Sequence, residues 1–453
     1  MDAADRFTAP LDTPADERLA YVISGVAAGN PGKPAILADA GAPHRRSISY
    51  ADLVGSIARL EQRLNEEHPR GVIARVRRPE SLVVIAAACG RQGTPVAFLA
   101  DDSLALTHDL REWVEVDDAL AVPSVPPAAR WPEGMEVAVP HVTVATSGTA
   151  GPPKLIRHSW ESVLAAARLA SQWHGLSWLM VYDATRWAGI QVWAQALLTG
   201  GTLVIPASRD PDTVAKALVE EGVSMLPATP TLLRRLLTSA DPALLERNAL
   251  TRITLGGEAA DAALLERAHE VFPRATITQV YATTELGEVY RVADGKPGFP
   301  AAWIGTRLQS GATLMVRRDG ELFVRVSRDA VDAGTGDLVE RQDDRYVFTG
   351  RRTDAIIVGG AKVFPKRVEE VIREVPGVAE ARVFGVPSSV TGELVAAEIT
   401  LAPPADSDAV KAAMKSTVLS YCRQVLEAQS VPRMLEIVDT IATTTAGKTP
   451  RRP

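Results

Sequence analysis

A glycine-rich segment with three hydroxyl side chains and a lysine follows a short run of alternating polar and apolar residues. Residues 146–154 read TSGTAGPPK, after HVTVA at 141–145. Glycines let a backbone turn tightly and approach a phosphate, and hydroxyl, N–H and ammonium groups can donate to its oxygens. The spacing differs from the GxxxxGK[ST] phosphate loop. A phosphate-binding loop and a plain glycine–proline turn between strands both remain open.

A second polar group, YATTE at residues 281–285, stands where an apolar strand is expected to end. Its ring can stack on a base or substrate, its hydroxyls can contact a phosphate, and its carboxylate is a ligand type that Mg²⁺ accepts. Two threonines and a glutamate are also typical of a helix cap. Taken alone, this motif does not decide between the two.

Two further motifs combine a carboxylate, an arginine and a lysine. TGD at 335–337 is expected in a turn, and GRRTD follows at 350–354. A carboxylate can accept from a ribose diol, and an arginine can contact phosphate or hydroxyl groups, although a surface turn with a salt bridge fits equally. AGKTPR at 446–451 places Lys448 close to the C-terminus, where a solvated charge is the simple interpretation.

The order and spacing of these motifs resemble the adenylate-forming superfamily, which includes acyl- and aryl-CoA synthetases, peptide-synthetase adenylation domains and luciferases. The resemblance spans nearly the whole chain and includes ISYADL at 48–53 and GGE at 256–258. The segment GRRTDAIIVGG at 350–360 is most similar to the aryl-CoA ligase branch. The resemblance implies an ATP-dependent enzyme that converts a carboxylic acid to an acyl-adenylate and pyrophosphate.

The resemblance also implies a role for each matching residue. The ATP β- and γ-phosphates would be held by Thr146, Ser147, Gly148, Thr149, Gly151 and Lys154. The nucleoside would be held by Gly256, Gly257, Glu258, a stacking Tyr281, Asp337 at the ribose and Arg351 near it. The reacting centre would comprise Thr284 at the α-phosphate, Glu285 as the Mg²⁺ ligand and Lys448 as the catalytic lysine.

Several positions depart from the pattern of that superfamily. Arg186 replaces the usual aromatic gate of the acid pocket, and it can hold an acidic substrate, the α-phosphate or Asp183. We favour the salt bridge with Asp183. Trp187 is the best tryptophan candidate for the acid pocket, and Ala282 in place of glycine would narrow it. Thr353 occupies the hinge position, where relatives carry Asp or Lys.

Composition excludes several other classes of protein. The chain has 453 residues, of which 46% are hydrophobic and 23% are charged, with a net charge of −6. That acidic balance argues against nucleic acid as the main partner. No stretch has the roughly 18–20 uninterrupted apolar residues of a membrane span. Two cysteines outside any metal-binding pattern favour a reducing, cytoplasmic setting.

Apolar spacing predicts the elements that position these motifs. Leu53, Ile57, Leu60 and Leu64 mark one buried helix face, and residues 81–88 continue in the same way. Short apolar runs at 95–99, 202–205 and 252–255 predict strands, so β–α alternation indicates a mostly parallel sheet covered by helices. From about residue 311 the pattern changes to turn-linked alternation, which predicts an antiparallel, barrel-like piece.

The last hundred residues predict a separate small unit. Val368, Val371, Ile372 and Val375 form a helix stripe after Pro365, strands follow at 381–386 and 394–401, and a second stripe runs over 410–425. We therefore predict an α/β fold with two domains. Residues 1–350 form a large adenylation domain of layered sheets and helices, and residues 351–453 form a small mobile α+β lid.

The predicted function is activation of an apolar, cyclic or aromatic acid with ATP and Mg²⁺, followed by transfer to CoA as a thioester. One alternative is delivery of the acyl group to a carrier protein in trans or to another acceptor. A second alternative is a catalytically inactive nucleotide-binding scaffold. Secondary metabolism is the setting that we expect.

Overall fold

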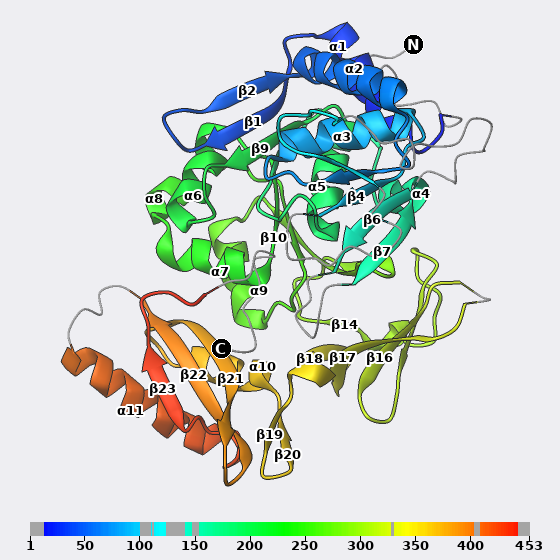
Figure 1. The fold of residues 1–453 in the computed structure, drawn as a ribbon. Coiled ribbons are helices and arrows are strands. Elements are labelled where there is room, and N and C mark those ends of the chain that lie inside the picture. The colour runs from blue at the N-terminus through cyan, green and yellow to red at the C-terminus, as the bar shows by residue number, and fades with distance from the viewer. Residues whose placement is uncertain are drawn as a thin grey trace.

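A computed structural model describes residues 13–99, 110, 113–123, 141–146, 154–327, 330–402 and 408–442. Its largest layer is an eight-stranded sheet, shown through the centre of Figure 1. In spatial order the strands are β13 (Gly287–Val292), β12 (Thr276–Thr283), β11 (Arg252–Gly256), β10 (Met225–Ala228), β8 (Ser177–Leu179), β9 (Thr202–Pro206), β1 (Pro34–Ala40) and β2 (Arg46–Ser49). The pairs from β12 to β1 are parallel, and only the edge strands β13 and β2 are antiparallel.

Helices cover both faces of this sheet. One face packs in a core with α1 (Arg18–Gly29), α2 (Tyr50–Glu67), α3 (Pro79–Arg91), α4 (Trp160–Leu164) and α5 (Trp187–Leu198). The other face packs in a core with α6 (Pro211–Glu220), α7 (Pro230–Ser239), α8 (Pro242–Leu245) and α9 (Ala262–Val271). The parallel α/β layer predicted from the sequence is therefore confirmed, and the four leucine and isoleucine side chains predicted for one face of α2 are all buried.

A second, five-stranded sheet carries the glycine-rich segment. Its strands, in spatial order, are β5 (Val114–Val116), β3 (Val72–Ala74), β4 (Val96–Phe98), β6 (His141–Ala145) and β7 (Leu155–Ser159). Only the β6–β7 pair is antiparallel. Helix α3 has ten consecutive buried residues, 81–90, because it lies inside the core between elements rather than on the surface.

The antiparallel piece lies to the side of the large sheet (Figure 1). Its strands, in spatial order, are β14 (Phe299–Pro300), β18 (Arg345–Arg351), β17 (Ala333–Gln342), β16 (Glu321–Arg325) and β15 (Thr313–Val316). All pairs are antiparallel, as the alternation predicts. The predicted turn at 335–337 is wrong, because these residues lie within β17. Gly336 has φ +72°, and the register of β17 on β16 is irregular there.

The C-terminal elements form their own layer below the other sheets (Figure 1). The strands are β20 (Ala361–Val363), β19 (Ile356–Val358), β22 (Gly392–Leu401) and β21 (Val378–Ser388), with β23 (Met434–Ile437) paired to β22. Helices α10 (Pro365–Arg373) and α11 (Asp408–Val425) pack on them. The predicted stripe of α10 is buried, whereas Val410 and Val425 of the α11 stripe are exposed at the two ends of that helix.

A short 3₁₀ turn, η6 (Arg352–Asp354), joins β18 to β19. Thr353 is exposed there, and its hydroxyl donates to the Asp354 carboxylate at 3.2 Å. The domain division at residue 350 and the hinge at Thr353 stay predictions.

Candidate active site

The two ends of the glycine-rich segment are tied together. Thr146 directly follows β6, and its backbone N–H donates to the carbonyl of Lys154 at 2.8 Å. The Lys154 N–H donates in turn to the Thr146 hydroxyl at 2.9 Å. These bonds continue the β6–β7 pairing by one residue pair beyond Ala145 and Leu155. Ser147, Gly148, Thr149 and Gly151, which we predicted in a phosphate-binding loop, lie outside the described residues.

Arg186 fixes the strand end from which this loop leaves. Its guanidinium donates to the carbonyls of Ala145 at 3.0 Å and Thr146 at 2.6 Å. The salt bridge that we favoured for Arg186 is wrong, because the Asp183 carboxylate instead accepts from the N–H and hydroxyl of Thr185. The Asp183 carboxylate thus accepts its hydrogen bonds from within its own loop. Arg186 instead links that loop to the end of β6.

The YATTE motif lies in a β-hairpin turn rather than at a helix cap. Strand β12 ends at Thr283, whose hydroxyl accepts from the N–H of Leu286, and β13 begins at Gly287. Glu285 at the tip is exposed. Trp187 packs against this turn, since a Cβ on Gly287 would lie 3.5 Å from the Trp187 ring.

Trp187 is otherwise buried, with its ring 4.5 Å from that of His158. Burial lowers the pKa of His158, which keeps the imidazole neutral at pH 7. His158 therefore supports the tryptophan as a neutral packing partner.

The GGE motif at residues 256–258 lies at the end of β11. Gly256 closes the strand, and Gly257 has φ +83°, a conformation that favours glycine. The Glu258 carboxylate accepts from the N–H and hydroxyl of Thr231 at 3.2 and 2.6 Å, so it binds the first turn of α7. Oxygen acceptors at a helix N-terminus satisfy N–H groups that have no partner within the helix.

Asp337 is the centre of a buried polar group. One carboxylate oxygen accepts from the Tyr281 hydroxyl at 2.6 Å, and the other accepts from Arg351 Nε at 2.8 Å. Burial and the Asp337 charge raise the pKa of Tyr281 well above its usual value, so this phenol stays a donor. Burial alone would lower the pKa of Arg351, but the Asp337 carboxylate raises it. The Tyr281 ring stacks on Tyr290 and Phe348, each at 5.3 Å.

One cavity of about 840 Å³ is lined by residues from these elements. It is lined by residues that we predicted at the site from the sequence: Thr146, Lys154, Arg186, Trp187, Gly256, Gly257, Glu258, Tyr281, Ala282, Thr284, Glu285, Asp337 and Arg351. Thr353 is not part of the lining, and Lys448 lies outside the described residues. The cavity therefore brings predicted residues from three sheets together, and among them Gly256 and Thr284 lie at the carboxyl ends of the adjacent parallel strands β11 and β12.

Sequence reasoning missed several lining residues. Gln191 and Gln195 follow Trp187 at intervals of four, so the three share one face of α5. Two polar side chains at helical spacing in the apolar run WAGIQVWAQALL were the available signal. Arg168 and Arg291 also line the cavity, but no local pattern marks either residue.

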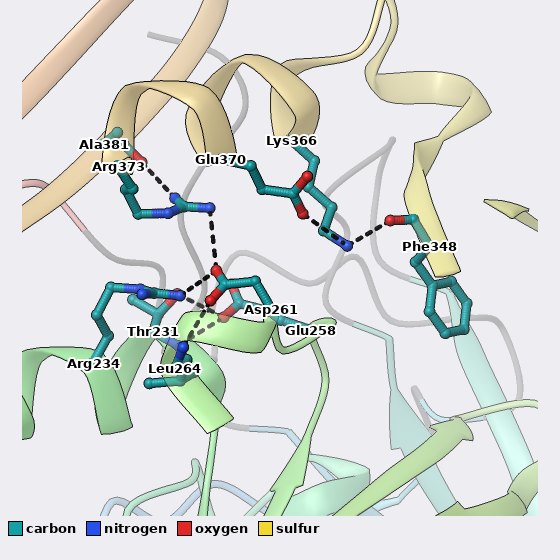
Figure 2. Close-up of polar contacts among 10 residues, drawn as sticks. All are labelled: Thr231, Arg234, Glu258, Asp261, Leu264, Phe348, Lys366, Glu370, Arg373 and Ala381. Carbon is teal, nitrogen blue, oxygen red and sulfur yellow. Dashed lines mark hydrogen bonds and ion pairs between the residues drawn. The ribbon is translucent and has the colours of Figure 1, made fainter. Parts of the chain in front are cut away.

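The C-terminal elements close one side of the cavity through charged contacts (Figure 2). Asp261 caps α9 by accepting from the Leu264 N–H, and its carboxylate pairs with Arg234 at 2.5 Å and with Arg373 at 3.8 Å. Arg234 comes from α7, whereas Arg373 comes from α10 of the C-terminal layer. Asp261 therefore joins two parts of the chain that are far apart in sequence.

Two further polar contacts join the C-terminal layer to the rest of the chain. Arg235 of α7 pairs with Glu380 of β21 at 3.5 Å. Lys366 donates to the Phe348 carbonyl at 2.5 Å and pairs with Glu370 at 3.5 Å. Burial lowers the pKa of Lys366, although the Glu370 charge opposes that shift.

We expect the Asp261→Asn variant to weaken this docking. Burial alone would raise the pKa of Asp261, but the charges of Arg234 and Arg373 hold it below its usual value. The stabilisation is therefore present above the unfolded pKa of about 3.9 and is lost as pH falls through the folded pKa. The variant should lose about 1–2 kcal/mol of unfolding free energy at pH 7, a range discounted for partial exposure. Denaturant unfolding at pH 7 measures the loss.

A matched control is the exposed pair Arg267–Glu270 on the same helix α9. Glu270→Gln should change the unfolding free energy by less than about 0.5 kcal/mol. Equal losses for Asp261→Asn and Glu270→Gln would contradict the interpretation of the Asp261 contact.

Among the described residues, no group of three or more His, Cys, Asp or Glu side chains is arranged to hold a metal ion. A Mg²⁺ bound mainly by substrate phosphates needs only one or two protein carboxylates, and the exposed Glu285 at the cavity meets that requirement. Within the same residues, no helix has the length and apolar character that crossing a membrane requires.

Family comparisons agree with this geometry. The model for the AMP-binding enzyme family matches residues 55–325, and the model for the AMP-binding enzyme C-terminal domain matches residues 367–448. The chain therefore belongs to the AMP-binding enzyme family, the AMP-forming ligases, and its predicted assignment to the adenylate-forming enzymes is confirmed.

Individual relatives differ in what they act on. A 2-succinylbenzoate–CoA ligase of Bacillus licheniformis is 26% identical over 67% of this chain and 67% of its own length. A fatty acid–[acyl-carrier-protein] ligase, MmaC, of Mycobacterium marinum is 26% identical over 69% of this chain and 67% of its own. The structure of the amide bond synthetase McbA from Marinactinospora thermotolerans is similar with a TM-score of 0.66, at 26% identity over 96% of this chain and 98% of that one.

Proposed function

We propose that this enzyme activates a carboxylic acid with ATP to an acyl-adenylate and pyrophosphate, and then transfers the acyl group to CoA. The single observation that carries the proposal is the shared cavity. Residues as far apart in sequence as Thr146, Thr284 and Asp337 line it together. With Lys154 and Arg351, they bring hydroxyl, carboxylate and cationic groups to one place, which is what a nucleoside triphosphate requires.

The first step is an in-line displacement. A carboxylate oxygen of the acid attacks the α-phosphorus of ATP, the bond from that phosphorus to the oxygen bridging the β-phosphorus breaks, and pyrophosphate leaves. No covalent enzyme intermediate forms, so the protein acts by positioning and by neutralising charge. Lys154 and Thr146 hold the terminal phosphates at the end of β6. Thr284 donates to the α-phosphate from the hairpin turn.

The nucleoside is placed by the opposite wall. Asp337 already accepts two hydrogen bonds from protein groups, and each carboxylate oxygen has a second acceptor site for a ribose hydroxyl. Arg351 pairs with this carboxylate at 2.8 Å. Glu285 would hold Mg²⁺, and the ion would supply neutralisation of phosphate charge and Lewis-acid polarisation.

Lys448, which lies outside the described residues, is the proposed catalytic cation. Ile441 lines the cavity, and the seven residues from there to Lys448 can span at most about 25 Å, so the chain length is compatible with a reach into the cavity. The Lys448 ammonium group stabilises the charge that develops on the α-phosphate oxygens.

The second step transfers the acyl group. The CoA thiol loses its proton, sulfur attacks the carbonyl carbon, and AMP leaves as the carbon–oxygen bond breaks. A carrier protein is the second candidate acceptor, since the relatives include both a CoA ligase and an acyl-carrier-protein ligase. Ser388 and Thr391 support that candidate, because aryl-CoA ligases commonly carry an acid and an aromatic residue at these positions.

ATP–pyrophosphate exchange over a panel of aromatic, cyclic and aliphatic acids tests the first step. We expect exchange with at least one cyclic or aromatic acid, and AMP release with that acid only after CoA or a carrier protein is added. Thioester on CoA supports the proposal, and thioester on the carrier alone supports the second acceptor. Nucleotide binding by calorimetry without exchange for any acid would identify an inactive scaffold.

A further inference from the structure

The cavity continues past the reacting centre along the β12–β13 hairpin. Across the hairpin, Ala282 pairs with Glu288 and Val280 pairs with Arg291, so these four side chains share one face of the sheet. Ala282, Glu288 and Arg291 line the cavity. Because two residues of strand span about 7 Å, Arg291 stands that much further from Thr284 than Ala282 does.

Two arginines and one carboxylate line this part of the cavity, which we name the arginine end: Arg168, Arg291 and Glu288. Glu288 forms a two-pronged pair with Arg291, at 2.6 and 2.5 Å. Arg168 is 3.8 Å from the same carboxylate, and its side chain is 47% exposed at the cavity. Arg252 lies over the Trp173 ring at 4.5 Å.

Two guanidinium groups therefore face a single carboxylate, and the charge of a third, Arg252, also acts on Arg168. Burial lowers the pKa of Arg168, and the like charges of Arg291 and Arg252 lower it further against the opposing Glu288. Glu288 is engaged by Arg291, and Arg252 has no carboxylate partner among the described residues. An anion that entered the arginine end would meet donors whose charge the protein does not balance.

The protein also holds Arg168 in place. The Gln195 side chain, 93% buried, accepts from the Arg168 N–H at 2.6 Å and donates to the Arg168 carbonyl at 2.8 Å. A buried amide that binds both backbone groups of one residue fixes its position. Such a fixed cation suits recognition of a ligand better than a solvated surface charge.

The neighbouring walls are aromatic. Trp173 and Trp178 stack at 6.1 Å, and both line the cavity. The indole N–H of Trp178 is buried without an acceptor in the described structure. A buried donor with no partner costs free energy, so a ligand oxygen that reached it would be favoured.

We propose that the acid activated by this enzyme carries a second anionic group, a carboxylate, which Arg168 binds at the arginine end with support from Arg291. The inference rests on the proposed function and narrows its substrate class. The apolar ring predicted for the acid packs against the tryptophans, and its far end is charged. The reacting carboxylate stays at Thr284.

Binding by calorimetry tests the inference without requiring turnover. The probes are aromatic diacids with carboxylates three to eight bonds apart, each compared with its monomethyl ester. We expect at least one diacid to bind about ten- to hundredfold more tightly than its ester, the range for one charged hydrogen bond. Raising the salt concentration should reduce that ratio.

Arg168→Gln should reduce the ratio to near one, and Arg168→Lys should restore part of it because the charge remains. Arg267→Gln, an exposed arginine on α9, is the control that leaves the ratio unchanged. The inference is overturned if every ester binds as well as its diacid, or if Arg168→Gln leaves the ratio intact. Pyrophosphate exchange on the same panel reports the proposed function separately.

Discussion

Lys448→Ala should lower the rate of acyl-adenylate formation about 100-fold or more, the cost of removing one preorganised donor from a charged transition state. The loss should appear in kcat for pyrophosphate exchange and leave KM for ATP nearly unchanged, because the ammonium acts mainly when charge develops at phosphorus. Thioester formation from a chemically prepared acyl-adenylate should keep its rate, since no phosphorus is attacked in that step.

Arg451→Gln, three residues away, is the control for a general effect on the C-terminal segment. It should keep exchange within about twofold of the wild type, because the proposal gives Arg451 no part in the reaction at phosphorus. If the two variants lost exchange equally, or if Lys448→Ala slowed thioester formation as much as adenylation, Lys448 would not have the proposed role.

Gly189→Ala should disrupt the acid side of the cavity. A Cβ at this buried position in α5 would lie 2.0 Å from the Asp183 carbonyl oxygen and 2.9 Å from the Ala184 Cα, so backbone must move. The displaced loop carries Arg186, which holds the strand end at Thr146. We expect a loss of about 2–3 kcal/mol of unfolding free energy. Pyrophosphate exchange should fall more than tenfold at a temperature where the variant is still folded.

The matched control is Gly55→Ala in α2, where the nearest atom to a new Cβ is the end of the flexible Arg59 side chain at 3.5 Å. That change should leave exchange intact and stabilise the protein by up to about 1 kcal/mol, because alanine favours helix more than glycine does. Chemical denaturation and exchange assays of both variants decide the point. A Gly189→Ala variant as active and stable as Gly55→Ala would contradict the packing argument.

Elements with strong apolar periodicity could be predicted from the sequence. The stripes of α2 and α10 are buried as predicted, because one face of each helix packs on a sheet. The predicted α11 stripe is only partly buried. Val418 and Cys422 are buried, but Val410 and Val425 at the helix ends are exposed. Periodicity identifies a face but not how far the neighbouring sheet extends beneath it.

Some features of the site could likewise be predicted from the sequence, and others could not. Motifs of fixed spacing identified Thr146, Asp337 and Arg351, all of which line the cavity. Partners could not be predicted, since hydrogen bonds depend on which distant strands meet. Arg186 binds two carbonyls of another sheet instead of its neighbour Asp183.

The arginine end was even less predictable from the sequence than these partners. Its arginines come from a loop after α4 and from β13, and nothing local distinguishes them from surface charges. Only the fold places them together beside one carboxylate. The most informative residues for the substrate are therefore the ones that motif matching cannot find.

Each of the two cysteines lies in a different hydrophobic core. Cys89 is in α3 of the large layer and Cys422 is in α11 of the C-terminal layer, and both are fully buried. Burial raises the pKa of Cys89 strongly and that of Cys422 to about 11, so neither presents a thiolate at pH 7. Neither thiol can take up the acyl group, and alkylating reagents modify each only when its own layer opens. Labelling rates at the two sites therefore report the opening of the two layers independently, without an added probe.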